Sequence, residues 1–158
     1  MTTRQVLLVA ALALVLVALV LRLEHRGGPA AGAVLASPVR TPGVLNPDVT
    51  QATIGSTICV SGWTRTVRPP VEYTNTLKAK QMRAYRETGA LSSYQEDHLI
   101  SLELGGHPTD PRNLWPEPYP RASAVDQVEN ELNAKVCSGS LSLADAQAQE
   151  SSLKHGAG

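Results

Sequence analysis

The chain contains no phenylalanine, and aromatic residues make up only 4% of its 158 residues. A hydrophobic core therefore has to be built from leucine, valine and isoleucine, together with two tryptophans. The formal net charge is zero, so the composition as a whole does not indicate a nucleic-acid-binding protein. A chain of this length allows one domain with accessory segments, and no internal repeat is visible.

The charges are unevenly distributed along the chain. Between Arg65 and Arg86, six basic residues stand against one acidic residue, and between Glu87 and Glu131 nine acidic residues stand against two basic ones. The basic stretch would suit phosphate groups, and the acidic stretch would suit a divalent cation. Two ordinary solvated faces would give the same pattern, so the charges alone leave both interpretations open.

The longest apolar run lies near the N-terminus, where Val6 to Leu21 form sixteen consecutive apolar residues between Arg4 and Arg22. This run is long for the apolar region of a signal peptide and short for a full membrane span. Residues 1–26 are therefore expected to be a signal peptide or a transmembrane anchor, and the small residues 31–33 offer a cleavage site. A buried core helix is the alternative, although no polar residue interrupts the run.

Two cysteines, Cys59 and Cys137, fit an exported chain, because an even number of cysteines in that compartment is typical of disulfides. A bridge between them would close a loop of about 79 residues. Chain-entropy arithmetic gives about 4–5 kcal/mol of stabilisation for a loop of that length. Two buried free thiols are the alternative.

Composition divides the rest of the chain into three parts. Residues 27–42 are rich in glycine, alanine and proline and are expected to form a flexible linker. Residues 43–153 are expected to form the domain, and residues 154–158 a tail. Near the start of the domain, β-branched residues predict short strands at 52–54 and 57–60.

Periodicity predicts the remaining elements. A helix is expected over 75–86, strands over 94–100 and 114–115, and a second helix over 122–136 that has one apolar face. Ser142 is expected to cap a last, short helix. This order of helices and strands predicts an α+β fold.

The segment most informative about function runs from Tyr94 to Gly106 and reads YQEDHLISLELGG. Asp97 and His98 place a carboxylate and an imidazole side by side, and a Gly-Gly pair follows them. Asn113 then stands just ahead of a second apolar run, in the sequence RNLWPEP. A metal ion held beside a general base needs groups of these kinds.

This pattern resembles the HNH-type ββα-metal endonucleases, and in particular exported HNH-like proteins of bacteria. The resemblance covers residues 94–137 and, more loosely, 41–153. It implies a small single domain with a ββα-metal core, and a hydrolase that cleaves phosphodiester bonds in nucleic acid with Mg²⁺ or another divalent cation such as Mn²⁺. The chain departs from the family in two ways. It lacks the Cys-x-x-Cys pairs that bind structural zinc, and its helix offers Asp126, Glu129 and Asn130 where the family often has histidine.

The resemblance implies roles for the residues of the motif. His98 is the expected general base, since a neutral imidazole takes a proton from water near pH 7. Asn113 is expected to hold the loop and to orient that base. Asp97 is the expected first metal ligand, because Mg²⁺ prefers oxygen ligands. The second ligand is expected from the helix, where the family favours Asn130 and charge favours Asp126.

Arg65, Arg68 and Arg112 are candidate phosphate-binding residues. Each of these assignments has a structural alternative. The Asp-His pair can form a surface turn, the asparagine an Asx turn, the helix residues an exposed polar face, and the arginines can be solvated.

We expect nucleic acid as the substrate, with DNA ahead of RNA, and the membrane as a second partner through the N-terminal segment. The protein is expected to be a monomer that is exported and is either anchored by its N-terminus or secreted. The alternative function is a non-catalytic cell-envelope module, binding or structural, on the same ββα scaffold. Convergence of His98, Asp97 and an oxygen of Asp126 or Asn130 on one solvent-reachable point would favour the enzyme.

Overall fold

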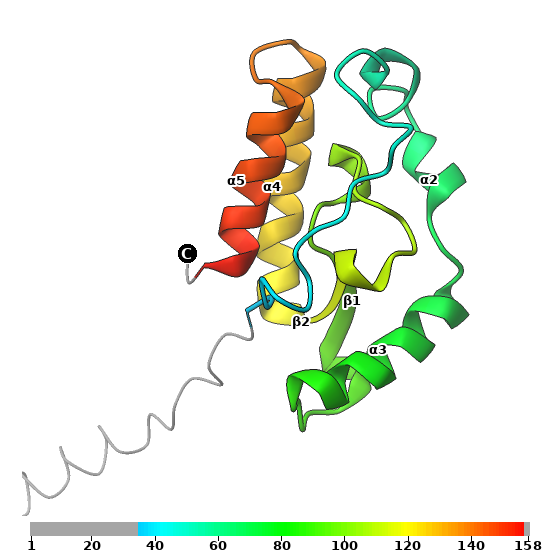
Figure 1. Ribbon diagram of the computed structural model, residues 1–158, viewed down its shortest axis with the longest axis vertical. Helices are drawn as coiled ribbons and strands as arrows, with labels where there is room; N and C mark the ends of the chain where they lie inside the picture. Colours follow the sequence, from blue (N-terminus) through cyan, green and yellow to red (C-terminus); the bar gives the residue numbers. More distant parts are fainter. Residues whose placement is uncertain (1–34, 157–158) are drawn as a thin grey trace, which may run out of the picture. The chain divides into compact units, whose positions relative to one another are not determined.

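Two short strands and the helices around them make up the part of the chain that the computed structural model describes, residues 35–156. The helices are α2 (Trp63–Val67), α3 (Val71–Tyr85), α4 (Tyr119–Cys137) and α5 (Leu143–His155), and the strands are β1 (Tyr94–His98) and β2 (Leu114–Pro118) (Figure 1). Short 3-10 helices lie at Ile54–Ser56, Leu91–Ser93, Leu102–Leu104 and Pro111–Asn113. The protein is thus a small α+β domain with a two-stranded antiparallel sheet, and the α+β prediction is confirmed.

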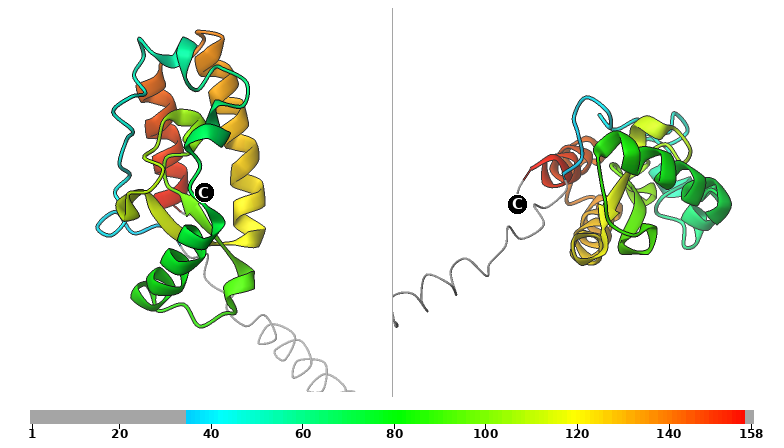
Figure 2. Two further views of the ribbon diagram at one scale, coloured as in Figure 1. Left: turned by 90° about the vertical axis from the view of Figure 1, so that its right-hand side faces the viewer. Right: turned by 90° about the horizontal axis from the view of Figure 1, so that it is seen from below.

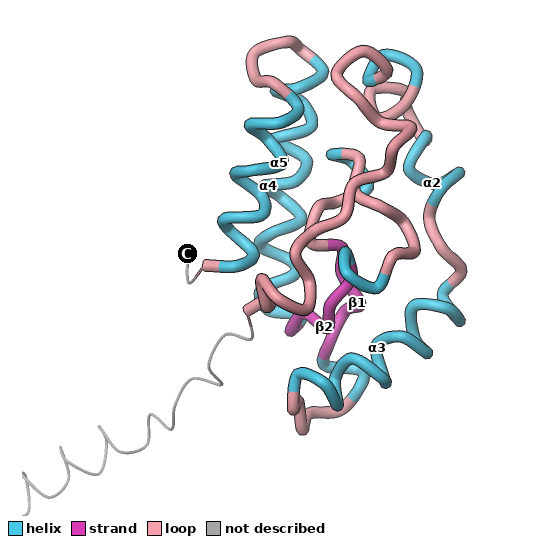
Figure 3. The backbone as a smooth tube through the Cα atoms, viewed as in Figure 1, coloured by secondary structure: helices cyan, strands magenta, loops and turns pink. Residues whose placement is uncertain are grey.

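The sheet depends on the helices that pack against it. β1 and β2 pair with Asp97 opposite Trp115 and His98 opposite Leu114, and an isolated two-stranded sheet is marginally stable at best. α3 and α4 each contact both strands, and α5 packs beside α4 (Figure 2). Loops form much of the chain between these elements (Figure 3). The helices therefore fix where the end of β1 lies.

The core is aliphatic, as the absence of phenylalanine requires. Its main cluster joins the loop after β1 to α4 and α5, and its buried members are Val49, Ile58, Ile100, Leu104, Leu132, Val136, Leu143 and Ala146. A second, smaller cluster of Ala36, Leu99 and Trp115 packs against Tyr85. Burial of these side chains supplies the main favourable contribution to folding.

The predicted strands at 52–54 and 57–60 are wrong. The chain there forms turns and the 3-10 helix Ile54–Ser56. The Thr53 hydroxyl donates to Asp48 O at 2.8 Å, and the Thr57 hydroxyl donates to Thr53 O at 2.8 Å. Such side-chain bonds to nearby carbonyls compete with an extended backbone, and β-branched composition does not reveal them.

The other predicted elements are present with shifted ends. α3 begins at Val71 rather than at residue 75, and α4 begins at Tyr119 rather than at residue 122. α4 has a proline in its first turn, where a missing N–H costs nothing. Ser142 caps α5 as predicted, since its Oγ accepts from Asp145 N at 3.1 Å.

The packed chain extends past both expected domain ends. Ala36, in the segment expected to be a linker, is buried, and its N–H donates to Lys154 O at 3.1 Å. Lys154, in the segment expected to be a tail, belongs to α5 and is completely buried. Composition reports local preference and not tertiary partners, so it misses these contacts.

No helix within residues 35–156 is long and apolar enough to span a membrane. The run from Val6 to Leu21, where the anchor or signal peptide is expected, lies outside the described residues. The candidate cleavage site at 31–33 lies outside them as well.

A disulfide joins Cys59 and Cys137, with 5.5 Å between their α-carbons, which confirms the predicted bridge. It ties the turn-rich segment before α2 to the last residue of α4. The bond is consistent with an extracellular or periplasmic location.

We expect the double variant Cys59→Ala with Cys137→Ala to fold and to lose about 4–5 kcal/mol of unfolding free energy, because the unfolded chain regains the freedom of a 78-residue separation. Urea denaturation of the full chain measures this loss. A loss of less than about 1 kcal/mol would show that the bridge constrains the unfolded chain far less than its length implies.

Candidate active site

One asparagine holds the loop between β1 and β2. Asn113 is completely buried, and its Oδ1 accepts from Ile100 N at 3.0 Å. Its Nδ2 donates to Ile100 O at 3.0 Å and to His107 O at 3.1 Å. These bonds reach back along the chain by six and thirteen residues, so the side chain braces the whole loop and does not form a local Asx turn.

The Gly-Gly pair lets the loop close around this asparagine. A β-carbon at Gly106 would overlap the Ile100 carbonyl and would lie 2.7 Å from Asn113 Nδ2. Gly105 has a φ of 76°, in the left-handed region that other residues rarely adopt. Gly106 therefore allows the close approach of two backbone segments, and Gly105 allows the turn.

We expect Gly106→Ala to cost about 3 kcal/mol or more of unfolding free energy, because the new methyl group must displace backbone that Asn113 holds. Gly55→Ala is the matched control, since nothing lies within 4 Å of a β-carbon there. Denaturant unfolding of both variants makes the comparison. Equal losses would mean that the loop adapts freely.

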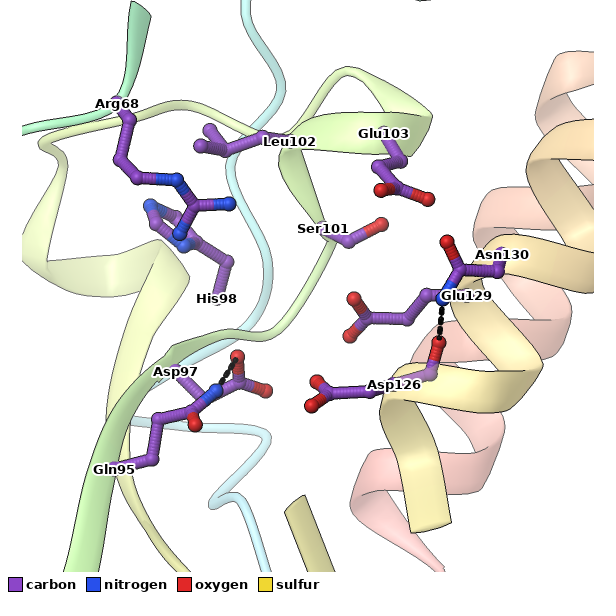
Figure 4. A pocket seen from close by; sticks show the side chains of 10 residues that line it. All are labelled: Arg68, Gln95, Asp97, His98, Ser101, Leu102, Glu103, Asp126, Glu129 and Asn130. Atoms are coloured by element: carbon purple, nitrogen blue, oxygen red, sulfur yellow. Dashed lines mark hydrogen bonds between the residues drawn. The ribbon is translucent and has the colours of Figure 1, made fainter. Parts of the chain in front are cut away.

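A cavity of about 370 Å³ opens between the end of β1, the 3-10 helix Leu102–Leu104 and α4 (Figure 4). It is strongly polar, and its walls carry carboxylates from both the strand and the helix. Its lining residues are Arg68, Gln95, Asp97, His98, Ser101, Leu102, Glu103, Asp126, Glu129 and Asn130.

Most of the predicted site residues meet at this cavity. Asp97, His98, Asp126, Asn130 and Arg68 all line it. Asp97 and His98 are consecutive in β1, and an ideal strand would send them to opposite faces. Both nevertheless reach the cavity, because His98 is the last residue of the strand.

The other predicted residues lie away from the cavity lining. Asn113 acts from inside the loop. Arg65 is exposed on α2, and Arg112 is exposed and pairs with Asp110 at 2.6 Å. The geometry therefore separates Arg68 from the other two arginines that the sequence grouped with it.

His98 is held as a neutral base. Its Nε2 lies 3.0 Å from Pro108 O, and because a carbonyl only accepts, Nε2 carries the proton and Nδ1 keeps its lone pair. Burial lowers the pKa of His98 below its ordinary value. Pro108 follows His107, whose carbonyl is bound by Asn113, so the buried asparagine reaches the imidazole through the loop.

The cation beneath the cavity is not among the residues predicted from the sequence. Lys154 is completely buried, and its Nζ donates to Asp97 Oδ2 at 2.8 Å, to Glu129 Oε1 at 2.6 Å and to His98 O. Glu150 Oε1 lies 3.4 Å from the same Nζ. The four-residue spacing of Glu150 and Lys154 on α5 signals an ion pair, but nothing in the local sequence signals its burial.

The carboxyl groups around Lys154 differ in their pKa values. Burial opposes ionisation of Asp97, but the Lys154 ammonium outweighs it and holds the pKa of Asp97 below its usual value. Burial, together with the nearby Asp97 charge, raises the pKa of Glu117 to about 8 and that of Glu129 to about 9. Of Asp97, Glu117 and Glu129, Asp97 is therefore the one whose pKa favours the ionised form at neutral pH.

The prediction of a metal-binding group is wrong for the described part of the chain. Within residues 35–156, no three His, Cys, Asp or Glu side chains are grouped so that they could hold a metal ion. The Lys154 ammonium already binds Asp97 and Glu129, and Asn130 Nδ2 donates to Asp126 O at 2.7 Å within α4. The residues present thus fit a protein-ligated metal centre poorly.

Comparison of the chain with protein-family models, curated proteins and solved structures finds no match. The likeness to HNH endonucleases therefore rests on the motif residues and their spacing alone. Function has to be argued from the cavity and the residues that line it.

Proposed function

We propose that the chain hydrolyses phosphodiester bonds in nucleic acid, as an HNH-like endonuclease whose core is β1, β2 and α4. The observation that carries the proposal is the state of His98: a neutral imidazole with Nε2 bound to Pro108 O, at the edge of an open polar cavity. A neutral imidazole at this position can take a proton from a water molecule in the cavity. The order strand, loop, strand, helix supports the family likeness.

In this proposal, His98 Nδ1 takes a proton from a water molecule in the cavity, and the resulting hydroxide attacks phosphorus. The Arg68 guanidinium lines the same cavity as His98, and its charge is one of the smaller causes that lower the pKa of the imidazole (Figure 4). It holds the phosphate and offsets the negative charge that builds on its oxygens. The leaving oxygen takes its proton from solvent.

We expect His98→Ala to lower the cleavage rate by about 10²–10⁴, because the general base is lost. Gel assays on plasmid DNA and on RNA measure the rate, and circular dichroism checks that the variant folds. The matched control is His155→Ala, whose ring binds Thr41 O away from the cavity. Cleavage by His98→Ala at the parent rate would refute the mechanism.

Arg68→Ala should lower kcat/KM by about 10–100-fold, the usual worth of one charged hydrogen bond to phosphate. Lys135→Ala removes an exposed cation near the end of α4 and serves as the control. The same DNA assay, run at several salt concentrations, compares the two. Equal losses of kcat/KM in both variants would show that Arg68 acts only through the general surface charge.

The requirement for Mg²⁺ or Mn²⁺ stays a prediction of the resemblance. The assay is therefore run with each ion and with chelator, on DNA and on RNA, and we expect DNA to be the better substrate. We also propose that the protein is exported and acts as a monomer, anchored by or released from its N-terminal segment. A full chain that is inactive under every condition would favour a non-catalytic envelope module on the same scaffold.

A further inference from the structure

We infer that Lys154 is a positioning residue for the proposed reaction: its buried ammonium holds the Asp97 carboxylate, the Glu129 carboxyl group and the His98 peptide together beneath the cavity. The inference rests on the proposed function, because it concerns how the base and the cavity wall keep their places. No catalytic role for Lys154 itself is implied, since a side chain with no exposed surface cannot touch the substrate.

The ammonium links three elements at one point. Its bonds reach Asp97 and His98 O at the end of β1, Glu129 on α4, and Glu150 on its own helix, α5. The strand that carries the base and the helix that forms the opposite wall are therefore joined through one buried group. Movement of either element would break a charged hydrogen bond in a buried environment, which is costly.

Glu150 extends this support to the far wall of the cavity. Both of its oxygens accept from Ser101 N, at 2.9 and 3.0 Å, and Ser101 lines the cavity. Burial raises the pKa of Glu150, and the Lys154 ammonium opposes that rise. Glu150 and Lys154, both on α5, thus contact the three parts of the chain that form the cavity: β1, α4 and the loop after β1.

The chain supplies its own control in a second buried lysine. Lys78 is 8% exposed, and its Nζ donates to Tyr94 O at 2.9 Å, at the opposite end of β1 from His98. It touches the same strand but does not line the cavity. Replacing either lysine by methionine removes one buried ammonium and keeps an unbranched apolar chain as far as the ε position.

The first test compares Lys154→Met with Lys78→Met in the full chain, by steady-state cleavage of DNA and by thermal unfolding. We expect Lys154→Met to lower kcat about 10²-fold, as a small misplacement of reacting groups does, and to change KM by less than about twofold. Lys78→Met should lower the melting temperature and leave kcat close to that of the parent. Equal effects on kcat would overturn the inference.

A double variant separates positioning from stability. Adding Glu150→Gln to Lys154→Met removes one of the charges left unpaired, and its amide oxygen can still accept from Ser101 N. The double variant should regain part of the lost melting temperature while kcat stays low. Recovery of kcat together with melting temperature would show that Lys154 is only structural.

A measurement without substrate keeps this test apart from the test of the proposed function. The ring resonances of His98, identified in NMR spectra by their loss in His98→Ala, should shift in Lys154→Met and not in Lys78→Met. A parent protein that cleaves nothing refutes the nuclease proposal and, with it, the role of Lys154 in that reaction. Unshifted His98 resonances in Lys154→Met overturn the positioning of the base, whatever the activity.

Discussion

The ammonium of Lys154 is the group on which the arrangement around the cavity depends. Burial disfavours a charged lysine, but the carboxyl groups of Asp97, Glu150 and Glu129 outweigh that effect and keep its pKa well above the usual value. The cation contacts all three groups and offsets the cost of burying them close together. Replacing such an ion pair by apolar residues is often harmless to stability, whereas removing one partner is costly. The cluster therefore specifies how β1, α4 and α5 meet, more than it adds net stability.

A second constraint, within the loop between β1 and β2, sets the tautomer of His98. Gly106 allows the loop to close on Asn113, Asn113 binds the carbonyl of His107, and the next carbonyl binds the imidazole of His98. Each step in this series needs the one before it. The glycines and the asparagine of the motif therefore have a chemical consequence without touching the cavity, because they decide which ring nitrogen keeps its lone pair.

The parts of the site that could be predicted lie close together in the sequence. Asp97 and His98 are adjacent on β1, and Asn113 comes just before β2. All three belong to one pair of strands and the loop between them, so their spacing in the sequence largely determines how they are placed. Lys154 acts across 57 residues, and its partners come from two other elements, so no local pattern announces it. The strands predicted at 52–54 and 57–60 are absent for a similar reason. Threonine hydroxyls there bind backbone carbonyl groups that composition does not reveal. The disulfide was predictable because the chain has only two cysteines.

The electrostatics of the cavity explain how an acidic segment could accept a phosphodiester. By residue count, the stretch from Glu87 to Glu131 is strongly negative. Burial raises the pKa of Glu129 to about 9, so this part of the wall carries less charge than its composition implies. Burial also raises the pKa of Glu103 and of Asp126. Asp97 stays ionised, but its charge is bound by Lys154. Among the residues that line the cavity, Arg68 is the cation that could hold a phosphate in the proposed reaction, and it lines the same cavity as the imidazole that would activate the attacking water.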